Sequence, residues 1–153
     1  MTDKIFETVL FNRKTMVSLL ENFTEEQVNF IPENFNNSIL WNTGHVLVTE
    51  QLLVYKLSGL PLKIDENLVQ LFAKGTKPEK KGSAEQIEVV KNLLESTVLK
   101  TRRDYKDRLF NKYQAYTTST GIVLKNVEDA LLFNCFHEGI HLGILMSLKK
   151  LVL

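Results

Sequence analysis

The sequence predicts an all-α fold, a four-helix bundle with long connections between the helices. Four stretches of roughly twenty residues place apolar side chains at three- and four-residue intervals, the period of an amphipathic helix. No stretch of comparable length alternates apolar and polar side chains as a half-buried strand does. The chain has 153 residues, of which 44% are hydrophobic, so we expect one domain over residues 1–153 with its own core.

Three of the four predicted helices begin after a residue that suits a helix N-terminus. Ser38, Ser83 and Asn126 each precede an apolar repeat, and their side-chain oxygens can accept hydrogen bonds from the first free backbone amides. Gly59, followed by Pro61, supplies a stop for the second helix. Helices are therefore predicted over residues 3–21, 38–57 and 83–110, and from 126 to a last turn near 149–150.

The connections between these helices differ in composition. Residues 22–37 contain Pro32 and five asparagines, which predicts an irregular segment with a short turn that Thr24 can cap. Residues 65–74 could form a short helix, and residues 74–82 are expected to be a mobile, solvent-facing loop without a functional role. Residues 111–125 form another long connection, which could contribute to a pocket wall.

Charge and cysteine content exclude several classes of protein. The formal net charge is only +1, and a local basic cluster is interrupted by Asp104 and Asp107, so we expect no nucleic-acid partner. Glu138 and two histidines interrupt the longest apolar stretch, so no membrane span is expected. A single Cys135 rules out an internal disulfide, and the first residues do not resemble a signal peptide, so a cytoplasmic location is expected.

The three histidines of the chain are its most informative residues. His137 and His141 lie four residues apart in the fourth predicted helix, about 40° apart around the axis and roughly 6 Å apart along it. Their imidazoles can therefore converge on one ion, and His45 in the second predicted helix can supply a third ligand. Three protein ligands leave a coordination position open for water or substrate, which implies chemistry.

An alternative needs no metal, because a histidine on an apolar face is often a hydrogen-bonded core residue. The third histidine on a second buried helix favours the metal site. The segment from His137 to His141 also satisfies a metalloprotease pattern, His-Glu-x-x-His, but its third ligand would lie far upstream. A protease is therefore a minor alternative.

Several residues near the histidines are candidates for a supporting role. Trp41 and Thr49 share a helix stripe with His45, and Asn134 shares a face with His137, so these three are predicted to support the ligands or line a pocket. A buried Asn134 that only satisfies backbone groups is an equal alternative. Glu138 points about 100° away from His137, which predicts that it is exposed or reaches the site from a subunit edge.

The opposite face of the fourth helix carries Cys135, Gly139 and Gly143. Cys135 lies about 200° from His137, so we expect a core residue and not a fourth ligand. The two glycines leave a shallow groove where another helix can approach closely. Packing within the chain is favoured slightly over a dimer contact, and both alternatives stay open.

The segments Trp41-Asn42-Thr43-Gly44-His45 and His137-Glu138-Gly139-Ile140-His141-Leu142-Gly143 resemble those of the DinB-like (DinB/YfiT) superfamily of metal-binding four-helix bundles. The resemblance covers nearly the whole chain and implies that His45, His137 and His141 bind a divalent metal, most often nickel or zinc. Characterised relatives include S-transferases that use bacillithiol or mycothiol, and a mycothiol-dependent maleylpyruvate isomerase. Relatives often carry Gly-Gln where this chain has Gly143-Ile144, so the identity of the substrate does not transfer.

The leading hypothesis is a cytoplasmic, metal-dependent thiol transferase or hydrolase that acts on a small molecule. A low-molecular-weight thiol is the expected partner, and a homodimer is the expected assembly if the glycine face is not filled within the chain. The alternative hypothesis is a binding or stress-associated module with a structural metal.

Overall fold

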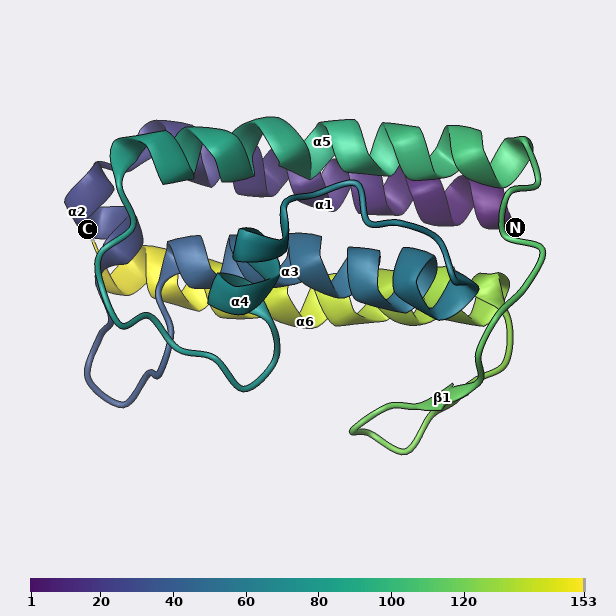
Figure 1. Ribbon diagram of the computed structural model, residues 1–153. Coiled ribbons are helices and arrows are strands. Elements are labelled where there is room, and N and C mark those ends of the chain that lie inside the picture. The colour runs from purple at the N-terminus through teal and green to yellow at the C-terminus, as the bar shows by residue number, and fades with distance from the viewer. Residues whose placement is uncertain (153) are drawn as a thin grey trace.

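The computed structural model describes residues 1–152, and its four long helices form a bundle (Figure 1). The helices are α1 (Thr2–Asn22), α3 (Ile39–Glu50), α5 (Ala84–Lys106) and α6 (Val127–Leu151). Each of α1 and α3 packs against both α5 and α6, and α3 and α5 run opposite to α1 and α6 (Figure 1). The predicted all-α four-helix fold is confirmed.

The capping residues act as the sequence predicted. The side chains of Ser38, Ser83 and Asn126 accept hydrogen bonds from the backbone amides three residues ahead, at the starts of α3, α5 and α6. The turn after Thr24 is a short helix, α2 (Glu25–Asn29), in which Thr24 and Gln27 form a reciprocal capping box. These bonds satisfy amides that have no partner inside their own helix and so fix where each helix begins.

The second long helix is less regular than predicted. After Glu50 it continues as a π-helical turn, η1 (Gln51–Tyr55), and a 3₁₀ turn, η2 (Lys56–Ser58), before Gly59 ends it in the left-handed conformation with φ 69°. The predicted end near residue 57 is thus confirmed, but the single regular helix is not. A π turn accommodates one extra residue, and apolar spacing along the sequence is too coarse to detect it.

The third long helix ends at Lys106, four residues earlier than the predicted Phe110. Arg108 adopts the left-handed conformation with φ 59°, and its amide donates to the carbonyl of Tyr105. The next amide, of Leu109, donates to the carbonyl of Asp104, which completes a Schellman cap. Glycine usually occupies the left-handed position, so an arginine there left no stop signal in the sequence.

Two smaller elements lie beside the bundle. Helix α4 (Glu66–Phe72) crosses α3, close to the predicted short helix, and the connection after α5 contains a two-stranded antiparallel sheet, β1 (Tyr116–Thr117) with β2 (Val123–Leu124) (Figure 1). The chain before β1 is tied to the second long helix, because the Tyr113 hydroxyl donates to the Leu53 carbonyl at 3.0 Å. Such short strands give no periodic signal, so the sequence did not predict them.

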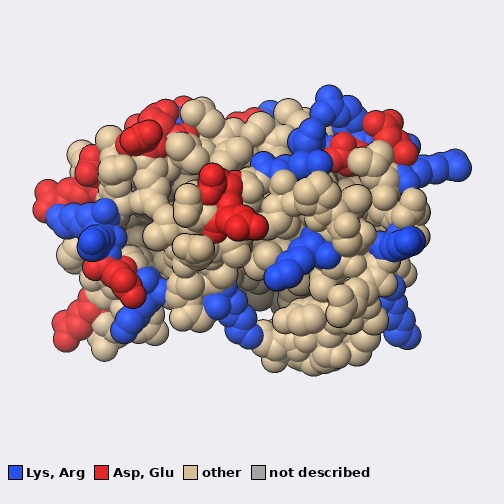
Figure 2. All heavy atoms as spheres, in the orientation of Figure 1, with Lys and Arg blue, Asp and Glu red and all other residues tan. Residues whose placement is uncertain are grey.

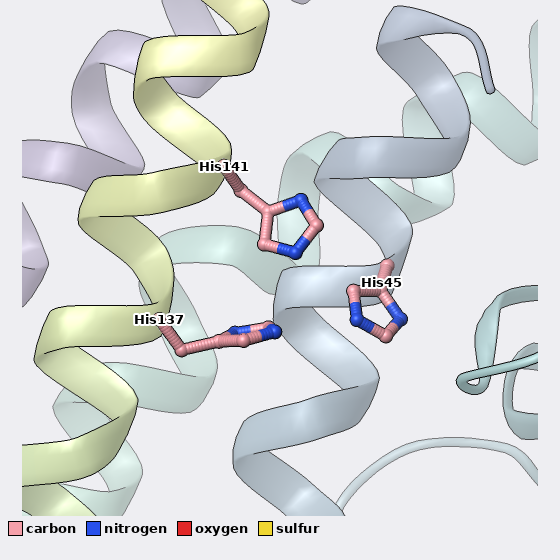
Figure 3. Close-up of side chains that lie close together, drawn as sticks. All are labelled: His45, His137 and His141. Carbon is pink, nitrogen blue, oxygen red and sulfur yellow. The ribbon is translucent and has the colours of Figure 1, made fainter. Parts of the chain in front are cut away.

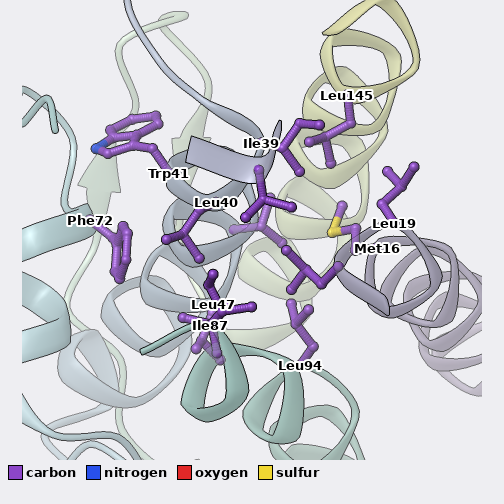
Figure 4. Packing of buried hydrophobic residues seen from close by; sticks show 14 of the residues in the cluster. Met16, Leu19, Ile39, Leu40, Trp41, Leu47, Phe72, Ile87, Leu94 and Leu145 are labelled. Carbon is purple, nitrogen blue, oxygen red and sulfur yellow. The ribbon is translucent and has the colours of Figure 1, made fainter. Parts of the chain in front are cut away.

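The apolar core lies between the four helices (Figure 4). Met16 from α1, Ile39 and Leu47 from α3, Leu94 from α5 and Leu145 from α6 are all fully buried, and Figure 4 shows them side by side. Burial of one such side chain stabilises the fold by about 1.5–3 kcal/mol relative to exposure. The helices are therefore held rigidly enough to present side chains from α3 and α6 at a fixed spacing.

Helix α6 is long and apolar enough, by composition alone, to cross a membrane. In the bundle it packs against α1 and α3, and its charged Glu138 is completely buried by them. A core helix of a soluble bundle satisfies the same length and hydropathy test. The apolar window of α6 is only 28% buried, so the bundle covers one side of the helix and leaves the other side exposed.

Candidate metal centre

Three imidazoles converge between α3 and α6 (Figure 3). His45 comes from α3, and His137 and His141 come from successive turns of α6. One ligand nitrogen from each ring lies within 4.8 Å of the other two. The structure thus brings together the three residues that the spacing singled out.

His45 is fixed on both sides of its ring. Its Nδ1 donates to the backbone carbonyl of Phe72 at 2.8 Å, and the ring stacks on Trp41 with centroids 4.6 Å apart and planes inclined by 10°. Because Nδ1 carries the proton, Nε2 keeps its lone pair and is free to bind an ion. The Thr49 hydroxyl lies 3.3 Å from that nitrogen, so it borders the position that an ion would take.

Gly44 allows the Phe72 carbonyl to reach His45. A Cβ atom at Gly44 would lie 2.5 Å from Cγ of the Phe72 ring, well inside van der Waals contact. Only glycine therefore lets the end of α4 pack this closely on α3. The sequence segment Thr43-Gly44-His45 thus combines a ligand with the small residue that orients it.

His141 is oriented by a bond across the bundle. Its Nδ1 donates to Oδ1 of Asn42 at 2.8 Å, and the Asn42 amide in turn donates to the carbonyl of Ser38 at 2.8 Å. Nε2 of His141 is therefore the nitrogen that is free for an ion. His137 differs, because its buried Nδ1 has no hydrogen-bond partner among residues 1–152. No hydrogen bond therefore fixes the tautomer of His137 before an ion binds.

Burial keeps all three imidazoles neutral. Desolvation lowers the pKa of His137 to about 3, helped by the neighbouring histidines and Arg13, and lowers the pKa of His141 to about 4. The pKa of His45 is also lowered, first by burial and then by the charge of Lys74, against the opposing effect of its bond to Phe72. Neutral imidazole is the form that binds metals, so at neutral pH no proton must leave before an ion enters.

The arrangement fits a divalent ion. Zinc–nitrogen bonds of about 2.0–2.1 Å place two nitrogens of a tetrahedral site about 3.4 Å apart. The observed spacing is within 4.8 Å, so small rotations of the rings suffice to bring the three nitrogens onto one ion. Three nitrogen donors and no acidic ligand suit borderline metals such as zinc or nickel better than magnesium or calcium.

A cavity of about 330 Å³ opens beside the histidines. His45 and His137 form part of its wall, together with Thr49 and residues from η1, α6 and the hairpin that β1 and β2 form. Tyr116, Thr118 and Ser119 line it from the hairpin, as predicted for the connection over residues 111–125. A small molecule in this cavity would therefore lie next to the ion site.

Glu138 is completely buried, which corrects the prediction that it is exposed or lies at a subunit edge. Its Oε1 accepts from Nη2 of Arg13 at 2.6 Å and from the Asn134 amide at 2.9 Å. Arg13 also donates to Glu50 at 3.2 Å, and Glu50 accepts from Thr101 at 2.6 Å. Burial alone would lower the pKa of Arg13, but the two carboxylates raise it, so Arg13 stays charged.

These five residues, called the Arg13 cluster below, join all four long helices: Arg13 on α1, Glu50 on α3, Thr101 on α5, and Asn134 and Glu138 on α6. An angular argument around one helix could not place Glu138, because a buried charge depends on a partner from another segment. The cluster fixes α6 directly beside His137. The whole side chain of Arg13 is buried, its guanidinium group included.

The opposite face of α6 also differs from the favoured prediction. Gly139 and Gly143 have nothing within 4 Å of where a Cβ would lie, so no helix of the described chain packs into that groove. Cys135 is half-buried beside a second apolar cluster, which includes Val54 and Leu131, and burial raises the pKa of its thiol, which keeps it protonated. The cysteine is thus neither a metal ligand nor a fully buried core residue.

The three predicted supporting residues have different positions. Trp41 stacks on His45, and Thr49 contacts the same ring and lines the cavity. Asn134 is 2% exposed and donates to Glu138, so its contact is with the Arg13 cluster. Residues 74–82, expected to have no role, carry Thr76, whose hydroxyl accepts from the Trp41 indole at 3.0 Å. This loop therefore helps to hold the ring that stacks on His45.

The sequence did not single out Asn42 or the carbonyl of Phe72. Asn42 lies one turn before His45 in the quoted segment, and that spacing was the only available signal. The Phe72 contact comes from backbone, which leaves no mark in residue type. Both contacts depend on how α3, α4 and α6 pack together.

The fold and the site define a helical-bundle protein with a three-histidine cluster that can hold a metal ion. The DinB superfamily matches residues 9–145 of the chain, which include all three histidines. The chain therefore belongs to the DinB superfamily. No curated protein shows a significant match to it.

Proposed function

We propose that this protein is a metal-dependent enzyme that acts on a small molecule, either as a thiol S-transferase or as a hydrolase. The observation that carries the proposal is the position of the histidine cluster at the wall of a cavity. A structural metal is normally enclosed by four protein ligands, whereas here the cluster has three histidines, two of which, His45 and His137, line a space of about 330 Å³. The open side favours catalysis over a purely structural metal.

His45, His137 and His141 would hold the ion, which is proposed to be nickel or zinc. When bound, such an ion would supply Lewis acidity, which lowers the pKa of a thiol or water at neutral pH. Thr49 positions the reacting group, because its hydroxyl borders the free nitrogen of His45 and loses that partner when the nitrogen binds an ion. Phe133 and Leu53 provide an apolar wall that excludes water from the reacting atoms.

The proposal is tested with protein loaded with zinc or nickel and assayed for thiol transfer to an electrophile across several low-molecular-weight thiols. Cobalt-substituted protein gives a second readout, because its visible spectrum reports ligand exchange at an open position. A spectral change on addition of thiol and activity that depends on metal are expected. A closed site would support the structural alternative. In that case no thiol changes the cobalt spectrum, and removal of the metal only unfolds the protein.

We further propose that the protein is cytoplasmic and forms a homodimer through α6. The free, half-buried Cys135 suits a reducing compartment. On α6 the solvent-exposed face between Leu132 and Ser147 carries no charge, and Leu132, Phe136, Ile140 and Met146 are each about half exposed there. A second copy of the same face can pack against it without like-charge repulsion, and the two glycines allow close backbone approach.

The dimer is tested by light scattering at micromolar concentration. Phe136→Glu places a charge at the centre of the face and should give monomers that keep their helicity. Leu99→Glu changes a similarly exposed residue of α5, 52% against 52% for Phe136, and should leave the dimer intact. A monomeric wild-type protein, or a Phe136→Glu variant that remains dimeric, would contradict this arrangement.

A further inference from the structure

The cavity beside the histidines has an uneven distribution of charge. Its lining contains two lysines, Lys56 at the end of the second long helix and Lys74 after α4, and no acidic residue. Neither lysine forms an ion pair within residues 1–152. Figure 2 shows the uncharged lobe that the hairpin forms and basic atoms beside the hollow next to it.

The rest of the lining is apolar or neutral. Leu52, Leu53, Leu57 and Phe133 provide hydrocarbon surface, and the hairpin adds the hydroxyl groups of Tyr116, Thr118 and Ser119. Hydroxyl groups can donate hydrogen bonds to an anion as readily as they accept them from a cation. The histidines of the lining are neutral, so its charged side chains are the two lysines, which have the same sign. The remaining walls suit a largely apolar molecule.

We propose that the cavity binds a small organic anion, whose apolar body lies against Leu53 and Phe133 and whose negative group contacts Lys56 and Lys74. The inference rests on the proposed function, since it names the substrate class of the same site. Lys56 and Lys74 act as specificity-determining residues, because they select the charge of the bound molecule and place it beside the histidines.

The selection is local and becomes stronger when an ion is present. The whole chain carries a net charge of only +1, so its overall field does not attract anions. Three neutral histidines do not cancel the charge of a divalent ion, so the loaded site adds two positive charges to those of the two lysines. A cavity lined by one sign of charge and apolar walls concentrates ligands of the opposite sign.

A pair of probes with the same shape and different charge tests the inference. Binding of 2-naphthoate and of its neutral analogue 2-naphthamide is measured by calorimetry and by amide chemical shifts, on metal-free and zinc-loaded protein. We expect the carboxylate to bind more tightly than the amide in both forms. Lys56→Gln and Lys74→Gln should each weaken carboxylate binding about two- to fivefold and leave amide binding unchanged. Higher salt should reduce the preference.

Lys149→Gln is the matched control, because it removes the same charge near the C-terminal end of α6, at the other end of the bundle from the hairpin (Figure 1). It should leave both affinities unchanged. Equal affinities for the two probes, no carboxylate binding by the wild-type protein, or a preference that survives in the Lys56→Gln/Lys74→Gln double variant would overturn the inference. A preference for the carboxylate that appears only in zinc-loaded protein and does not depend on either lysine would also overturn the inference. That result would leave the proposed metal site intact.

Discussion

Nδ1 of His141 donates to Oδ1 of Asn42 at 2.8 Å, and this bond connects α6 to α3 beside the candidate metal centre. It fixes the tautomer of His141 and leaves Nε2 free. His45 is fixed in the same way by the carbonyl of Phe72. Two of the three imidazoles are thus oriented before any ion binds, each by an element other than its own helix.

Asn42→Ala should weaken metal binding without removing any ligand. Loss of a hydrogen-bond partner behind a ligating histidine typically reduces metal affinity by about 10- to 100-fold. The measurement is a zinc competition titration against a chelator. Asn67→Ala, which changes an exposed asparagine near the start of α4, is the control. An Asn42→Ala variant with wild-type affinity would show that the bond does not orient His141.

Gly44→Ala should disturb the site through packing. The added methyl group would overlap the Phe72 ring at 2.5 Å, so α4 must move away and the Phe72 carbonyl must leave His45. We expect a destabilisation of about 1–3 kcal/mol in denaturant unfolding, together with weaker zinc binding. A Gly139→Ala variant meets nothing within 4 Å, so it should bind zinc as the wild type does and lose no stability; the helix preference of alanine should add up to about 1 kcal/mol. If Gly44→Ala binds zinc normally, the close approach of α4 is not required.

Arg13→Met should be strongly destabilising. It leaves Glu138 and Glu50 buried without their cationic partner, and breaking a buried ion pair in this way costs about 3–5 kcal/mol. Arg102→Met removes a partly exposed partner of Asp3 and should cost less than about 1 kcal/mol. Urea unfolding followed by circular dichroism measures both. Similar stabilities of the two variants would argue against a central role for the Arg13 cluster.

The metal-free protein should lose stability as the pH falls below about 6.5, the ordinary pKa of histidine. In the folded protein the pKa values of His137 and His141 are lowered to about 3 and about 4, so below pH 6.5 the unfolded chain binds protons that the folded chain does not. The stability linked to His141 is lost progressively down to about pH 4, and that linked to His137 down to about pH 3. Urea midpoints between pH 7.5 and 4.5 measure the slope, and His137→Gln should make it shallower. An unchanged slope in that variant would contradict the lowered pKa.

Periodic apolar spacing and capping residues were sufficient to predict the bundle. Ser38, Ser83 and Asn126 mark helix starts because a cap is a local interaction, which sequence records directly. The end of α5 and the π turn at Gln51–Tyr55 were not predicted, since a left-handed Arg108 and an extra residue in a turn leave the apolar pattern unchanged.

The ligand candidates could be found for the same reason, because His137 and His141 lie on one helix face at a spacing of four. The contacts that surround these ligands could not be predicted from the sequence. The Asn42 and Phe72 contacts and the burial of Glu138 each join segments far apart in the chain, so they depend on tertiary packing. The open glycine face of α6 likewise became visible only when no neighbouring helix filled it.

The three-histidine centre is tested most directly by the metal content of the purified protein after zinc loading and removal of excess ion. Elemental analysis should give one ion per chain for the wild-type protein and for Cys135→Ser. His137→Ala should lose stoichiometric binding while its circular dichroism keeps most of the helical signal. Full metal retention by His137→Ala, with unchanged affinity, would contradict the three-histidine centre.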